Sequence, residues 1–114
     1  MAHSQSIDSL EYHSEKMFDY GKREDYENAL FHAERINIIS PEDGAIYEHI
    51  GLNNLMLKNL DKAEIYLLKA IKYYPGDYVS YYNLACVQIE RNNIDQSFTY
   101  LDSAFLKGYG TIDD

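Results

Sequence analysis

Hydrophobic residues recur along most of the chain at the three- and four-residue spacing of amphipathic helices. Ala63, Leu67, Ala70 and Ile71 follow this spacing and therefore share one face of a helix. Polar stretches interrupt the pattern at regular intervals. The pattern predicts six helices, near residues 5–21, 25–39, 43–58, 61–74, 77–92 and 95–107.

Residues that start or stop helices fall between these segments. Asp25 and Asp61 are predicted N-caps, because a short acidic side chain accepts hydrogen bonds from the first turn of a helix. Proline, glycine and acidic residues cluster at 41–44 and 75–77, where the second helix of a pair is predicted to end. The helices are therefore expected to form antiparallel hairpins.

The hairpin pattern repeats every 34 residues without insertion or deletion. Large, small and turn-forming residues each return in register, and the first copy is weaker than the other two. Matching positions include Tyr47 and Tyr81, Leu67 and Leu101, Ala29 and Ala63, and Pro41 and Pro75.

This period, with its large residue, apolar-small pair, small residues and closing proline, resembles the tetratricopeptide repeat. The second copy carries the motif as Tyr47, Ile50, Gly51, Ala63, Leu67, Ala70 and Pro75. The resemblance implies an all-α fold, an α-solenoid of three antiparallel helix pairs wound into a right-handed superhelix. We expect one domain over residues 1–114, with repeats at 10–43, 44–77 and 78–110, and with residues 1–9 as a helix extension or tail.

The first copy departs from the motif. Lys16 and Met17 stand where the apolar-small pair belongs, and Ile36 replaces a small residue. Looser or differently spaced packing is expected there, because end repeats lack a neighbour on one side.

At the other end, Tyr109 replaces the closing proline, and too few residues follow it for a capping helix. An interface is therefore predicted at Phe98, Tyr100 and Phe105, either for self-association as a homodimer or for missing C-terminal sequence.

Composition narrows the classes of partner. The 114 residues carry a net charge of −9, which disfavours nucleic acid and anionic membranes, and residues 1–43 form the acidic pole. Cys86 is the single cysteine, so no internal disulfide is possible. No export signal or membrane span is evident, and we expect a cytoplasmic protein, although an export signal removed earlier would leave no trace.

The resemblance implies that ligands lie in a concave groove lined by the first helix of each repeat. Its predicted contacts are Glu15, Phe18, Glu48, His49, Leu52, Met56, Tyr82, Asn83 and Cys86. Apolar and acidic groups suit a protein or peptide segment that is apolar and basic. The alternative is that the glutamates are only a solvated face.

Family members that hold the acidic tails of heat-shock chaperones use a clamp of lysines, an arginine and asparagines. The matching positions here are Ser14, Phe18, His49, Val79 and Asn83. None of these side chains can pair as a lysine or arginine with a terminal carboxylate, so a clamp is not expected.

Reactive chemistry finds little support. Glu15, His49 and Asn83 share one repeat position, so a polar ladder with a charged His49 is one hypothesis, and an exposed His49 without a special partner is the other. His49 and Cys86 both belong to first helices, but no third group is evident to orient the imidazole. We expect no catalysis, no metal site and no cofactor.

Overall fold

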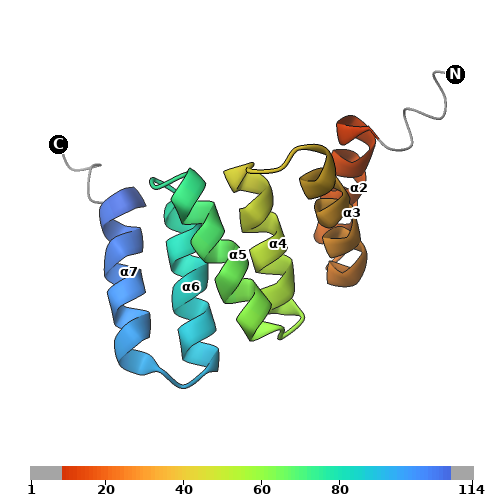
Figure 1. The fold of residues 1–114 in the computed structure, drawn as a ribbon. Helices are drawn as coiled ribbons and strands as arrows, with labels where there is room; N and C mark the ends of the chain where they lie inside the picture. Colours follow the sequence, from red (N-terminus) through yellow and green to blue (C-terminus); the bar gives the residue numbers. More distant parts are fainter. Residues whose placement is uncertain (1–8, 109–114) are drawn as a thin grey trace, which may run out of the picture.

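The computed structural model describes residues 9–108, which form six α-helices and no strand. Figure 1 shows them side by side in chain order, with α2 and α7 at opposite ends of the row. We name α2 and α3 the first pair, α4 and α5 the second pair, and α6 and α7 the third pair. The bounds are α2 Leu10–Lys22, α3 Tyr26–Ile39, α4 Gly44–Met56, α5 Leu60–Tyr73, α6 Tyr78–Glu90 and α7 Ile94–Gly108.

The predicted helices are confirmed to within a few residues, except at the start. Ser9 is extended and caps α2 with its hydroxyl, which accepts from the Tyr12 amide, so the helix begins at Leu10 rather than near residue 5. The predicted segment 5–8 lies outside the described residues.

One of the two predicted N-caps is correct. Asp25 caps α3 and accepts from the Asn28 amide. Asp61 does not cap α5, because that helix already begins at Leu60 and its N-cap position is Asn59. Asp61 instead stands in the first turn, where a negative charge is favourable to the helix dipole.

The turn inside each pair has the same backbone form. Glu24, Lys58 and Asn92 stand 34 residues apart and all take a left-handed φ, of 59°, 67° and 63° respectively. In each case the next amide donates back into the end of the first helix, for example from Asp25 to the Tyr20 carbonyl. This arrangement closes a helix and reverses the chain.

Small residues bring the helices of the second pair into close contact. A Cβ added to Gly51 of α4 would lie 2.6 Å from Cγ of Leu67 on α5, so Leu67 occupies the space that the glycine leaves. Ala63 and Ala70 are buried on the same face of α5. The contact depends on one large and one absent side chain.

In the first pair the large residue of this contact lies on the first helix and the small residue on the second. Met17 stands in register with Gly51, and Ala33 stands in register with Leu67. Met17, Ala33 and Ile36 are buried together in one core cluster. The expectation of loose packing is therefore wrong for the interior of this pair, because the smaller Ala33 makes room for Met17.

The junction between the first and second pairs is spaced differently from the junction between the second and third pairs. α4 approaches α6 to within 8 Å between Cα atoms, whereas α2 makes no such approach to α4 among the described residues. Among the described residues, α3 packs closely along α4, whereas α2 reaches α4 through side chains, as where Phe18 meets His49. Space therefore opens between α2 and α4.

Candidate functional site

A hollow of about 310 Å³ lies where the first helices of the first two pairs diverge. Three of the predicted groove residues, Phe18, His49 and Leu52, line it together. The rings of Phe18 and His49 meet edge to face with centroids 5.3 Å apart. The remaining lining residues are Met17, Gly21, Lys22, Tyr26, Ala29 and Asn53.

Two carboxyl groups on the second and third pairs, Glu48 and Asp77, lie near His49, which lines this hollow. Asp77 is the N-cap of α6 and is buried, and it accepts from the amide and the hydroxyl of Ser80. Glu48 of α4 lies near enough to Asp77 for the charge of Asp77 to act on its carboxyl group. Asp77 already accepts two hydrogen bonds from Ser80, and its negative charge nearby favours the protonated form of Glu48.

The ionisation of Glu48 reflects this environment. Burial is the largest cause, and together with the charge of Asp77 it raises the pKa of Glu48 to about 7. The groove therefore contains a carboxyl group that changes its charge near neutral pH.

His49 behaves differently from the hypothesis of a carboxylate-charged imidazole. Burial lowers the pKa of His49, although Asp43 and Asp77 oppose that shift. The desolvation of the ring outweighs the two carboxylates, so the neutral form is favoured. In this form the ring packs as an aromatic surface on Phe18.

The other predicted groove residues are spread along the array. Glu15, Met56 and Tyr82 are exposed, and Cys86 is half-buried and hydrogen-bonded to Tyr82. Burial raises the pKa of the Cys86 thiol, which disfavours the nucleophilic thiolate.

Asn83 is 6% exposed, and its side-chain Nδ2 has no hydrogen-bond partner among the described residues. The structure does not join it with Glu15 and His49 through any hydrogen bond described for residues 9–108. The polar ladder therefore stays a prediction.

The three predicted C-terminal interface residues lie on different faces of α7. Phe98 and Phe105 are 59% and 57% exposed and stand seven residues apart, which places them on one face. Tyr100 lies on another face and packs against the core cluster that contains Leu55 and Leu67. The fold thus separates Tyr100 from the two phenylalanines.

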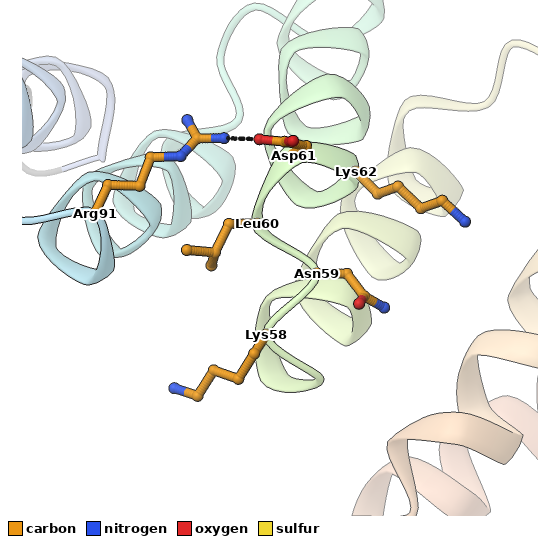
Figure 2. Close-up of a pocket in the computed structure, with 6 residues that line it drawn as sticks. All are labelled: Lys58, Asn59, Leu60, Asp61, Lys62 and Arg91. Carbon is orange, nitrogen blue, oxygen red and sulfur yellow. Dashed lines mark hydrogen bonds and ion pairs between the residues drawn. The ribbon is translucent and has the colours of Figure 1, made fainter.

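Another hollow, of about 500 Å³, lies at the turn between α4 and α5. Figure 2 shows Arg91 reaching across to Asp61 from the end of α6, while Lys62 points away from that pair. Arg91 also pairs with Glu64, and Lys58 pairs with Glu90. These cations are engaged with neighbouring acids, so the hollow is a joint between helices rather than an anion site.

Sequence reasoning missed two features of the site. Asp77 was interpreted only as part of a turn signal, and its contact with Glu48 joins residues from two different pairs. Gly21 was not singled out, although the 34-residue register sets it against Leu55. That size difference was the signal available in the sequence.

Residues 66–98 match the family model described as tetratricopeptide repeat. No curated protein matches the chain in sequence. Within residues 9–108, no three histidine, cysteine or acidic side chains gather to hold a metal ion. No helix in the same range has the length and apolar character needed to cross a bilayer.

Solved structures share the fold at low sequence identity. The TPR2B domain of yeast Sti1 in complex with pHsp70 gives a TM-score of 0.84 at 22% identity, over 91% of this chain and 83% of that one. The TPR2AB domain of yeast Sti1 in complex with pHSP90 gives 0.83 at 22% identity, over 91% of this chain and 40% of that one. MamA from Desulfovibrio magneticus RS-1 gives 0.82 at 17% identity, over 90% of this chain and 58% of that one.

The repeat match and the shared fold define the class of the protein, an all-α solenoid of helix pairs. Residues 66–98 match a tetratricopeptide repeat, and the six described helices have the arrangement of about three such repeats. This fold serves as a scaffold for protein interactions, since its stacked pairs present an extended surface.

Proposed function

We propose that the chain is a peptide-binding adaptor whose groove, formed by α2, α4 and α6, holds an apolar segment that carries lysine or arginine. The observation that carries the proposal is the hollow at Phe18 and Leu52 beside the carboxyl pair of Glu48 and Asp77. His49 links the hollow to the carboxyl pair, because its ring packs on Phe18 and interacts with the charge of Asp77. Apolar anchors with acidic neighbours favour a ligand of this kind.

The overall charge supports the same ligand class. The net charge is −9, and Glu11 and Glu15 are exposed on α2. A basic segment would be steered toward this end of the array, and the effect should weaken with salt. The single cysteine, Cys86, suits a cytoplasmic location for such an adaptor.

The proposal excludes the acidic chaperone tails held by a carboxylate clamp. Phe18 and His49 occupy two of the clamp positions, and they pack on each other instead of presenting cations. Val79 and Asn83 occupy two more, and Asn83 is buried. The two Sti1 complexes therefore share the fold with this chain without indicating its ligand.

The test uses a short fluorescent peptide rich in lysine with one central leucine, and a second peptide in which glutamate replaces each lysine. The lysine peptide should bind more tightly, and charge reversal by Glu15→Lys or Glu48→Lys should weaken it by about tenfold. Glu34→Lys is the matched control, because Glu34 is exposed on α3 outside the groove. Equal binding of the lysine peptide to all three variants and the unmodified protein would count against the proposal.

Binding of the lysine peptide should also depend on pH. Since the pKa of Glu48 is about 7, its carboxyl gains a negative charge as pH rises through that value. Affinity should therefore rise between pH 6 and 8 by roughly a factor of ten or less, given that the group is only half-buried. Titration by fluorescence anisotropy checks this, and the Glu48→Gln variant should show a flat profile over that range.

A second candidate function is self-association through the outer face of α7. The exposure of Phe98 and Phe105 on one face favours it, because an apolar patch commonly marks an interface. Sedimentation at several concentrations decides the matter. A monomer at every concentration would rule this candidate out, whereas a dimer lost in Phe98→Ser would support it.

A further inference from the structure

The hollow beside α2 exists because one large side chain is missing from the 34-residue register. Leu55 of α4 is 6% exposed and packs between the second and third pairs, in the cluster that contains Leu84 and Val87. Thirty-four residues earlier, α2 has Gly21. A Cβ added to Gly21 would have no heavy atom within 4 Å. The first junction therefore lacks the leucine that fills the second junction.

The vacant space is large enough for a side chain and is reached from the groove. Its volume is about 310 Å³, and a cavity of roughly 150 Å³ already admits a benzene-sized molecule. Phe18 and His49, which belong to the proposed groove, form part of its wall. A side chain of a bound peptide can thus enter without opening the core.

The lining selects the chemistry of that side chain. Met17, Tyr26, Ala29 and Leu52 present mainly apolar surface. Asn53 is the polar residue of the interior, and its amide group already donates to the His49 carbonyl at 2.9 Å. Lys22 also lines the hollow and disfavours a second cation. An uncharged, aliphatic occupant fits this set of groups.

We propose that the hollow at Gly21 is a specificity pocket for one aliphatic side chain, of leucine or methionine size, carried by a peptide bound in the groove. The peptide would supply the group that Leu55 supplies at the second junction. This inference rests on the proposed peptide-binding function and deepens it. It states that one position of the peptide must be aliphatic, while the basic residues occupy other positions of the peptide.

The test pairs the lysine-rich peptide that has a central leucine with the same peptide carrying alanine there. The leucine peptide should bind the unmodified protein about tenfold more tightly, because the additional methyl and methylene groups are buried only in that complex. In the Gly21→Leu variant the protein fills the pocket itself, so both peptides should bind equally and weakly. Gly21→Ala is the matched control and should keep most of the preference.

The outcomes separate this inference from the proposed function. If neither peptide binds the unmodified protein, the proposed function fails and the pocket assignment fails with it. If both peptides bind the unmodified protein equally well, or if Gly21→Leu keeps the preference for leucine, only the pocket assignment is overturned. Circular dichroism of each variant confirms that it is folded before binding is measured.

Discussion

The two junctions of the array follow the same backbone plan but are filled differently. Between the second and third pairs, Leu55 packs with Leu84 and Val87, and α4 approaches α6. Between the first and second pairs, Gly21 leaves space beside Asn53, and α2 stays apart from α4. One junction is a closed core and the other is an open pocket. The difference teaches that a single small residue in the repeat register leaves a hollow where a large residue would close the core.

The two regions also differ in their ion pairs and in their aromatic rings. Arg91 links α6 to Asp61 and Glu64 on α5. In the first junction, Leu57 stands in register with Arg91 and cannot form an ion pair. Inside the pairs, a buried histidine pair in the first replaces the tyrosine pair of the second. The first pair is therefore built from different chemistry on the same frame.

The largest expected effect comes from opening the closed junction. Leu55→Gly should lower the free energy of unfolding by about 4 kcal/mol, since a buried leucine leaves a cavity and glycine weakens the helix. Urea denaturation measures the loss. Leu68→Gly is the control, because Leu68 is exposed on α5 and should cost only about 1 kcal/mol. Equal losses in the two variants would show that this junction is not closely packed.

The next largest effect on stability is expected from changing the sizes of the two side chains that meet inside the second pair. Gly51→Met should cost about 3 kcal/mol, because even a Cβ at that position meets Leu67 at 2.6 Å. Leu67→Ala should cost a similar amount through its cavity. The double variant reproduces the Met17 and Ala33 combination of the first pair and should be more stable than either single variant. Additive losses in chemical denaturation would mean that the two sites are independent.

Closing the open junction should stabilise the protein. Gly21→Leu is expected to add about 2 kcal/mol, of which about 1 kcal/mol comes from helix propensity and the remainder from filled space. Thermal unfolding measures the gain, and Gly21→Ala isolates the propensity component. If both variants gain the same amount, the leucine side chain does not enter the hollow.

The smallest expected effect is a pH dependence in the first pair. Nδ1 of His13 lies 2.8 Å from Nδ1 of His32, and both rings are buried. Burial, with His13 and Lys16 adding to it, lowers the pKa of His32 from 6.5. A group whose pKa falls on folding stabilises the protein above its unfolded pKa, and that contribution is lost as pH falls below 6.5.

The measurement compares unfolding of the protein and of a His13→Tyr, His32→Tyr variant between pH 7 and 5. The variant restores the ring types of Tyr47 and Tyr66 in the second pair. It should lose less stability on acidification, by on the order of 1 kcal/mol. The raised pKa of Glu48 makes its contribution to stability increase as pH falls, opposite to that of His32. This contribution is the same in both proteins, so it cancels when their pH profiles are compared. Parallel pH profiles would contradict the role of the histidine pair.

Much of the fold could be predicted from the sequence alone. The 34-residue register and the three- and four-residue spacing depend on short-range backbone geometry, so the helix pairs and the Asp25 cap followed from them. The register also set Gly21 against Leu55, and this is why the open pocket was present in the sequence although it was not recognised.

Only the tertiary structure decided which side chains meet between pairs. The contact of Glu48 with Asp77, the neutral preference of His49 against Phe18 and the partners of Arg91 depend on the distance and rotation between helices. A single helix pattern does not fix these quantities, because they arise from how the side chains at each junction fill the space. The sequence determined the repeat, and the packing at each junction decided where the repeat closes and where it stays open.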